Sequence, residues 1–551
     1  MTTTVQVAGP RQQRQWGGTR ARSSRSSDDG GPDRRNCLVA PEEPIPGGSP
    51  PPALQGACPA EARLPSAARA AAEPCAGSGW AGGESCRGRR ARPIAARPQP
   101  GRGYNPEGRW RRRFLREGAM GPAALLLGSV AGAAVLLLLL GEGSPALPSG
   151  LLPLLLWAVG GGAAWLALRP LRIRRALDSV GYLPEAGWSR AQAAHRVRRS
   201  RRIGQLPPVY PNGWFRLLQS AQLAVGEVRN VAALGEQFAV FRDADGKAHV
   251  VDAYCPHLGA NLAIGGRVVG SCIECPFHGW QFHGANGKCT RIPYAEKVPE
   301  FAKIKVWPSC EASDMIFVWY HCDGIDPTWQ VPKQEDLLPQ RCVFRGITEH
   351  FVSAHIQEIP ENAADVAHLA FLHGPWFMNG VDLQYTKSNL WTFFEHQWQA
   401  EWQPDPEPNT HCSFLHLNHR LTIFGKHFRL MDLSVSAKQV GPALVFLIFK
   451  HRFLGQGILI QSITPLEPLL QHVVHQMYYQ KNVPAFIPKF MLWAESLQFE
   501  RDIMIWNNKQ HLSRPLLVKE DATIQRHRRW FAQFYSEKSV KFTSRKESLD
   551  W

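Results

Sequence analysis

Two short clips of cysteine and histidine constrain the middle of this chain more than any other feature. The segment CPHLGANLAIGGRVVGSCIECPFHGW, residues 255–280, holds Cys255 and His257 in a C-x-H clip and Cys275 and His278 in a C-x-x-H clip. Thiolate and imidazole are common ligands of transition metals, so two such clips in one segment indicate a metal centre. The glycines between the clips would let the backbone pass close to that centre.

The order of the four ligands narrows the type of centre. A zinc finger normally groups its cysteines in one clip and its histidines in the other, whereas each clip here supplies one of each. The interleaved order suits a two-iron cluster with both thiolates on one iron and both imidazoles on the other. The pattern closely resembles the Rieske [2Fe–2S] motif, which implies Cys255, His257, Cys275 and His278 as cluster ligands. A zinc-stapled loop is one alternative, and a redox pair of Cys272 with Cys275 is another.

A second set of candidate ligands lies in the segment ENAADVAHLAFLH, residues 361–373. Asp365 and His368 are three residues apart and would share one face of a helix. His373 follows His368 by five residues, and an ideal helix would rotate it away from that face. We therefore expect the helix to distort or end at this point, where Gly374-Pro375 follows.

Two histidines and one carboxylate can hold Fe(II) and leave positions open for other ligands. The downstream segment FERDIMIW offers Asp502 as the carboxylate, with Glu500 as a nearby alternative. With the two metal motifs in this order, residues 212–535 resemble the Rieske-type non-haem iron oxygenases, which carry a D-x-x-H-x-x-x-x-H helix and a distant Asp. The resemblance implies His368, His373 and Asp502 as ligands of a mononuclear iron.

The closest resemblance within that family is to the animal cholesterol 7-desaturase (Neverland-type) group. It is carried by the ending RPLLVKEDATIQRHRRWFAQFY, which is similar to the steroid-hydroxylating branch, and by apolar segments near the N-terminus. It implies a sterol desaturase that uses O2 and NAD(P)H to convert cholesterol to 7-dehydrocholesterol. It also implies a homotrimer in which Asp365 carries electrons from a neighbouring subunit's Rieske histidine. We assign a catalytic role to Asn362 as well, although Asp365 could instead orient a ligand histidine.

Other functions remain open at this point. The motifs do not separate a desaturase from a sterol or steroid hydroxylase, since both reactions use the same iron. A membrane-anchored Rieske electron carrier without catalysis is a second alternative. We find no G-x-G-x-x-G segment in a strand-turn-helix unit, so we expect a separate ferredoxin and ferredoxin-reductase-type electron donor. Phe446, Phe449 and Phe453 could line a sterol pocket, although core packing is the better interpretation for any one of them.

The N-terminal third has a different composition. Residues 1–119 are rich in Gly, Pro, Ala, Arg and Ser, and we interpret them as a disordered basic tail, which the apolar start after Met120 suggests is dispensable. Two uncharged apolar runs, 122–140 and 151–168, are each just long enough to cross a hydrocarbon core of about 30 Å. Arginine clusters flank both runs, which predicts a membrane hairpin with both ends in the cytosol. A single span with a buried or interfacial helix is one alternative, and a removed signal peptide is another, although the second run and its arginine cluster argue against it.

These observations predict an α+β chain with four parts. They are the tail (1–119), a membrane anchor of two apolar helices (120–175), an all-β Rieske [2Fe–2S] domain (212–325) and a mixed α/β, helix-grip-like catalytic domain with a mononuclear iron (340–540). The net charge of +17 lies largely in the tail and beside the apolar runs, so it indicates membrane topology rather than nucleic-acid binding. We expect a membrane location in the endoplasmic reticulum, with the catalytic domain in the cytosol.

Overall fold

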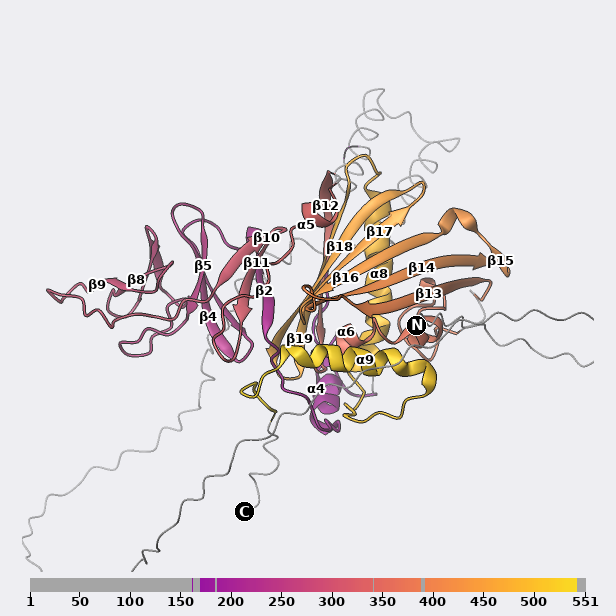
Figure 1. Cartoon of the computed structure of the whole chain (residues 1–551), viewed down its shortest axis with the longest axis horizontal. Coiled ribbons are helices and arrows are strands. Elements are labelled where there is room, and N and C mark those ends of the chain that lie inside the picture. Colours follow the sequence, from indigo (N-terminus) through magenta and orange to yellow (C-terminus); the bar gives the residue numbers. More distant parts are fainter. Residues whose placement is uncertain (1–160, 162–168, 184–185, 340, 388–391, 543–551) are drawn as a thin grey trace, which may run out of the picture. The chain divides into compact units, whose positions relative to one another are not determined.

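The computed structural model describes residues 161, 169–183, 186–339, 341–387 and 392–542 (Figure 1). The predicted tail and, apart from Gly161, both apolar runs lie outside the described residues. In the part of the chain that the structure describes, no helix has the length and apolar character needed to cross a membrane. The membrane hairpin therefore stays a prediction.

Residues 213–320 form three small antiparallel sheets. The first has the order β3-β4-β5, the second β10-β11-β2 and the third β6-β7-β8-β9. The strands are β2 (Gly213–Gln219), β3 (Val228–Ala233), β4 (Glu236–Arg242), β5 (Ala248–Asp252), β6 (Arg267–Val269), β7 (Cys272–Glu274), β8 (Gln281–His283), β9 (Cys289–Arg291), β10 (Ser309–Ala312) and β11 (Met315–Tyr320), with a 3-10 turn η1 (Ser220–Gln222) after β2.

The hairpin expected around an Asp-Gly turn is confirmed. Strands β4 and β5 pair antiparallel, with Arg242 opposite Ala248. The turn between them contains Asp245 and Gly246, and Gly246 has a φ of +83°, a conformation in which a side chain would be strained. The first metal clip begins at Cys255, soon after β5 ends at Asp252.

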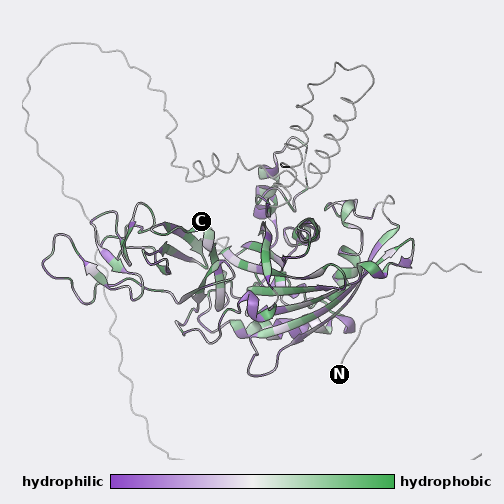
Figure 2. Cartoon of the chain, turned by 90° about the horizontal axis from the view of Figure 1, so that it is seen from above, coloured by the Kyte–Doolittle hydropathy of each residue, from purple (hydrophilic) through white to green (hydrophobic). Residues whose placement is uncertain are grey.

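The rest of the described chain is built around one large sheet. Its order is β1-β12-β19-β18-β17-β16-β14-β13, with β15 paired to β14, and its hydrophobic and hydrophilic residues alternate along several strands (Figure 2). All neighbours are antiparallel except β1, which runs parallel to β12. The strands are β1 (Leu171–Arg174), β12 (Cys342–Val352), β13 (Phe394–Pro404), β14 (Cys412–Ile423), β15 (Lys426–His427), β16 (Leu433–Val440), β17 (Leu444–His451), β18 (Gly455–Glu467) and β19 (Leu470–Gln480).

The helices are few and mostly short. The 21-residue helix α8 (Phe486–Trp506) contacts β12 and β19 of the large sheet. The others are α4 (Arg190–Ser200), α5 (Gln334–Leu337), α6 (Glu358–Glu361), α7 (Val366–Leu372) and α9 (Ala522–Phe531), with 3-10 turns η2 (Phe377–Asn379), η4 (Arg429–Met431), η5 (Lys519–Asp521) and η6 (Ala532–Phe534). The mixture of strands and helices supports an α+β fold that is mostly β.

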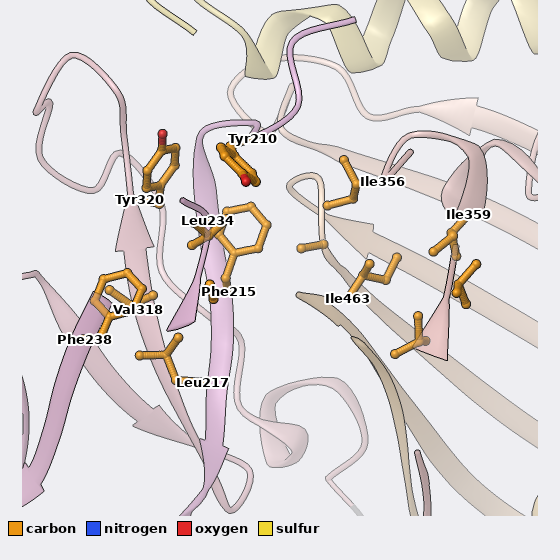
Figure 3. Close-up of a cluster of buried hydrophobic side chains, with 14 of the residues drawn as sticks. Tyr210, Phe215, Leu217, Leu234, Phe238, Val318, Tyr320, Ile356, Ile359 and Ile463 are labelled. Carbon is orange, nitrogen blue, oxygen red and sulfur yellow. The ribbon is translucent and has the colours of Figure 1, made fainter. Parts of the chain in front are cut away.

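One buried hydrophobic cluster includes residues from the small sheets, the large sheet and α8. Phe215 on β2 and Ile463 on β18 both belong to it and are fully buried (Figure 3). Ile359 of α6 and Phe499 of α8 are members as well. The two parts of the chain that carry the predicted metal motifs therefore share one continuous core, and burial of such side chains is the main favourable term in folding.

The three phenylalanines considered for a sterol pocket have different environments. Phe446 and Phe449 are buried in two separate core clusters, as ordinary core packing predicts. Phe453 lies in the turn between β17 and β18 and is 64% exposed, so it belongs to neither a core nor an enclosed pocket.

Several histidines are buried away from water and hold low pKa values for that reason. Burial lowers the pKa to about 3 or about 4 at His355, His396, His419, His475 and His527. His527, on α9, packs against Trp402 and Trp530, and neither of its ring nitrogens has a hydrogen-bond partner among the described residues. A neutral imidazole is therefore the form that this core accepts.

The low pKa values of these histidines predict that the free energy of unfolding falls in mild acid. In the unfolded chain a histidine takes up its proton near pH 6.5, whereas the folded pKa of His527 is about 3, so the unfolded state binds more protons between these values and the free energy of unfolding falls as pH falls. His527→Phe should make the loss between pH 7 and pH 5 smaller by about 2 kcal/mol. Urea unfolding at both pH values measures it, with the exposed His416→Phe as control. The same pH difference in both variants would contradict the prediction.

Candidate metal centres

The two Cys/His clips adopt the same backbone geometry. In the first, the amide of Gly259 donates to the carbonyl of Cys255 at 2.9 Å, and the amide of Cys255 donates to Ala260. In the second, Gly279 donates to Cys275 at 3.1 Å, and Cys275 donates to Trp280. Both glycines have φ values above +70°, which a residue with a side chain rarely adopts. The glycine four residues after each cysteine is therefore required by the turn that holds the clip.

The two clips place sulfur inside and nitrogen outside. Cys255 and Cys275 are 2% and 3% exposed, whereas His257 and His278 are half-buried. The two imidazole rings lie with centroids 4.7 Å apart, and Trp280 stacks on His257 at 4.8 Å. A metal centre held here would therefore have its thiolates in the core and its imidazoles at the surface.

The chemistry of this donor set fits a [2Fe–2S] cluster. Both cysteines are free thiols. Burial, together with the adjacent Cys275, raises the pKa of the Cys255 thiol to about 11, so this thiol would keep its proton unless a cation replaced it. Two thiols and two neutral imidazoles from clips of matching geometry are the ligands that a Rieske cluster takes.

The second motif is built around the two ends of the short helix α7. Asp365 is the N-cap residue, and its carboxylate accepts from the amide of His368 at 3.2 Å. The helix ends at Leu372, and His373 is its C-cap residue. The expectation that the helix ends near Gly374 is confirmed, and this ending turns His373 back toward His368.

The structure brings His368, His373 and Asp502 together. One ligand atom from each of them lies within 4.8 Å of the other two, close enough for one ion. His373 Nε2 lies 3.2 Å from Asp502 Oδ1, and the centroids of the two imidazole rings are 5.1 Å apart, with the rings almost perpendicular. Asn362 donates to Asp502 Oδ1 at 3.1 Å.

Hydrogen bonds on the far side of each histidine favour metal binding at Nε2. His368 Nδ1 contacts the carbonyl of Asp365, and His373 Nδ1 contacts Gln498 Oε1 at 3.1 Å. Oxygen acceptors at both Nδ1 atoms select the tautomer with the proton on Nδ1, which leaves the Nε2 lone pair for a metal. The donor set of two neutral imidazoles and one carboxylate fits a mononuclear Fe(II).

Charge acts differently on the two histidines. Burial lowers the pKa of His368 below its usual value. Burial also opposes protonation of His373, but the nearby Asp502 carboxylate outweighs it and raises the pKa of His373. A metal cation between these residues would replace the proton on His373 and balance the negative charge of Asp502.

Glu500, the alternative carboxylate, lies away from the two histidines of the motif. It accepts from Arg175 Nε at 2.7 Å and lies 3.4 Å from His350 Nε2, whereas Asp502 lies beside His373. The two acids are two positions apart on α8, so their side chains leave the helix in different directions.

The sequence reasoning missed three side chains that hold His373 and its loop. Gln498 contacts His373 Nδ1, and Trp398 Nε1 donates to the His373 carbonyl at 3.3 Å. Arg501 is fully buried, and its guanidinium donates to Gln498 Oε1 at 3.0 Å and to the carbonyls of Leu372, Pro375, Trp376 and Gly380. The spacing of Gln498 four residues before Asp502 was the available signal, since such residues share a helix face.

Two protein families match this chain over consecutive regions. The Rieske [2Fe-2S] domain matches residues 213–302. The 3-ketosteroid 9alpha-hydroxylase C-terminal domain matches residues 318–535. The first region contains both Cys/His clips, and the second contains His368, His373 and Asp502.

Three similar proteins each match 60% or more of this chain. Cholesterol 7-desaturase nvd of Xenopus laevis is 62% identical over 402 residues, which are 73% of this chain and 87% of that protein. Cholesterol 7-desaturase nvd 1 of Ciona intestinalis is 46% identical over 68% of this chain and 80% of that protein. A probable 3-ketosteroid-9-alpha-monooxygenase oxygenase component of Rhodococcus rhodochrous is 30% identical over 60% and 82%, respectively.

The two acids on α8 provide a matched test of the mononuclear site. Asp502→Asn should weaken metal binding by more than about 100-fold, because it removes the one carboxylate beside both histidines. Iron should fall from about three to about two per chain, while the Rieske EPR signal stays. Glu500→Gln should keep all the iron, since Glu500 bonds Arg175 instead. Equal loss of iron in both variants would contradict this assignment.

Proposed function

Because this chain belongs to the cholesterol 7-desaturase family of Rieske oxygenases, we propose that it introduces the 7,8 double bond into cholesterol. The product is 7-dehydrocholesterol. The observation that carries this proposal is the 62% identity to the Xenopus desaturase across 87% of that protein. The reaction consumes O2, two electrons and two protons for each sterol and releases two molecules of water.

Cys255, His257, Cys275 and His278 would hold the [2Fe–2S] cluster, and His368, His373 and Asp502 the mononuclear iron. When bound, the cluster supplies electrons one at a time, and the iron activates dioxygen toward an unactivated C–H bond. The protein's part is to fix these ligands and to keep water away from the buried His373 and Asp502. Gln498 and the Asp365 carbonyl hold the imidazoles in one tautomer, and Asn362 orients the Asp502 carboxylate.

Two separate partner proteins would supply the electrons. A separate reductase would take electrons from NAD(P)H, and a ferredoxin-type carrier would deliver them to the half-buried histidines of the Rieske clips. A homotrimer would bring one subunit's clips to the next subunit's α7. Asp365 supports this route because its carboxylate accepts from the backbone amide of His368 and its carbonyl contacts His368 Nδ1.

Membrane attachment is part of the same proposal. The apolar runs at 122–140 and 151–168 would anchor the chain in the endoplasmic reticulum membrane as a hairpin, with the catalytic domain in the cytosol. Cholesterol partitions into bilayers, so an anchored enzyme would meet its substrate there.

A sterol or steroid hydroxylase is the second candidate function. The match of residues 318–535 to the 3-ketosteroid 9alpha-hydroxylase C-terminal domain favours it. The same iron site would serve both reactions, and the position of the sterol would decide between them.

Product analysis separates the desaturase from the hydroxylase directly. Cells that lack the activity would express the full chain and receive isotope-labelled cholesterol. A product two hydrogens lighter supports the desaturase, and an oxygen-bearing product supports the hydroxylase.

Removal of one histidine should separate the two metal centres. His368→Ala should abolish conversion of labelled cholesterol, because two ligands cannot hold the iron in place of three. The Rieske EPR signal should be unchanged, since the clips lie on other elements. Loss of that signal in the variant would contradict two separate centres, and full turnover would show that the chain does not use this site.

Asp365→Asn tests the electron route without removing the helix cap. Asparagine caps helices about as well as aspartate, so α7 should keep its start while the negative charge is lost. We expect both metals to bind and electron transfer from the reduced cluster to slow by more than about tenfold. Stopped-flow absorbance of cluster reoxidation measures this rate. An unchanged rate with both metals present would remove Asp365 from the route.

A further inference from the structure

Several turns meet at one end of the large sheet. The β14–β15 turn follows Ile423, the η4 segment follows it in the chain, and the β17–β18 turn follows His451. His451 Nε2 lies 2.9 Å from the carbonyl of Leu430, which joins the second and third of these turns. Strand β19 also ends at this end of the sheet: Gln480 Oε1, at its last residue, accepts from the amide of Gln456 at the start of β18. Helix α8 begins six residues later, at Phe486.

These turns expose large apolar side chains to water. Phe424, Phe453 and Phe486 are 74%, 64% and 69% exposed. Further exposed members are Phe428, Leu430, Met431 and Phe490. Such a grouping at the tips of loops is uncommon on a surface that faces only water, and it marks a contact surface.

The conformation of Phe424 supports a role for its exposed ring. Phe424 has a φ of +50°, and Gly425, which follows it, has a φ of +74°. A hairpin turn of this kind normally takes Asn or Gly at its first position, because most residues with a side chain are strained there. The Phe424 ring stacks on Phe393, just before β13, with centroids 4.8 Å apart, and the side chain is still 74% exposed.

The same turns carry a strong excess of positive charge. Lys426 and Arg429 lie beside the exposed aromatic residues of the first two turns, and Lys450 and Arg452 lie beside Phe453. All four are exposed. In residues 421–433 and 450–456 the one acid is Asp432, which lies 2.6 Å from His427. Apolar tips interleaved with lysine and arginine match the interface of an anionic lipid bilayer.

The direction of β1 gives an independent argument. Its register runs parallel to β12, from Leu171 beside Gly346 to Arg174 beside Glu349. The start of β1 therefore points toward the start of β12, where Cys342 pairs with Gln480. This is the end of the sheet that carries the exposed turns. The apolar run 151–168 ends just before β1 in the sequence, so the chain enters the fold at this same end.

We propose that this strand-end face docks on the headgroup region of an anionic lipid bilayer. The strand-end face consists of Phe424, Lys426, Phe428, Arg429, Leu430, Met431, Lys450, Arg452, Phe453 and Phe486. Its aromatic and aliphatic tips enter the interface, and its four cations bind lipid phosphates. The contact with lipid does not depend on which substrate the enzyme uses. The statement that the substrate taken from the bilayer is a sterol rests on the proposed function.

The strand-end face continues toward the mononuclear site. Phe490, one turn into α8 from Phe486, contacts Phe377 with ring centroids 5.5 Å apart. Phe377 in turn contacts His396 at 6.4 Å, and the amide of His396 donates to the carbonyl of Gly374, next to His373. A membrane seated on this face would place a bilayer sterol next to the aromatic residues that lead to the iron ligands.

Photo-crosslinking to lipid tests the docking on the full chain. Wild-type protein would be reconstituted in vesicles of phosphatidylcholine and phosphatidylserine containing a phospholipid with a photoreactive group near its headgroup. Mass spectrometry should find lipid adducts on the peptides of residues 423–433 and 450–456. Leu516 and Phe301 are 98% and 84% exposed elsewhere, so their peptides provide the internal control. Adducts at the control level, or protein–protein cross-links in their place, would overturn the proposal.

Charge variants test the anionic component. Arg452→Gln and Lys426→Gln should each reduce adduct yield on these peptides by up to about fivefold, because one cation at a membrane surface contributes about 1 kcal/mol. The reduction should vanish in vesicles of phosphatidylcholine alone. Lys519→Gln, an exposed lysine on η5, is the matched control and should change nothing. Equal effects of all three variants would overturn the charge assignment.

A turnover measurement keeps this proposal separate from the enzyme function. Phe424→Ser with Phe453→Ser should lower product formation from vesicle-borne cholesterol and leave formation from cyclodextrin-borne cholesterol unchanged. Lipid adducts without any sterol product from wild-type protein would support the docking and count against the proposed function. Normal product from vesicles in the double variant would count against the docking while leaving the function in place.

Discussion

The guanidinium of Arg501 lies in the protein core with no exposure to water, and five oxygen atoms from α8 and the loop after α7 receive its hydrogen bonds. A buried cation is costly unless such acceptors surround it, so the loop and α8 stabilise one another at this point. The loop begins with His373, and α8 carries Asp502 as the next residue after Arg501. Arg501 therefore helps to fix the positions of His373 and Asp502 at the candidate iron site.

The two candidate metal centres differ in how they meet the solvent. The Rieske clips bury their thiols and leave their imidazoles half-buried, which gives an electron carrier access to the cluster's nitrogen side. At the second centre, His373 and Asp502 are buried and their outer atoms are held by Gln498 and Asn362. Such an arrangement suits a site that must exclude water from its chemistry. The strand-end face complements it, because an apolar substrate would reach that site from a lipid phase.

Sequence reasoning succeeded where contacts are local. The β4–β5 hairpin follows from Asp245-Gly246, and the end of α7 follows from His373 and Gly374-Pro375, because turn and helix geometry depend on neighbouring residues. It failed for contacts between distant segments. Arg501 and Gly380 are 121 positions apart and Trp398 and His373 are 25 apart, and no spacing rule connects them. The choice between Asp502 and Glu500 likewise needed the direction in which each leaves α8.

The sequence by itself determined the chemistry that this protein can hold: the identity and order of the cysteine, histidine and carboxylate ligands, and the apolar and basic segments near the N-terminus. These follow from residue type and local spacing, which folding does not change. The tertiary structure decided which of those residues meet, which ring nitrogens stay available, and that turns from β14, β17 and α8 expose their apolar side chains at one end of the sheet. These depend on strand register and core packing between distant segments, and no local pattern encodes them.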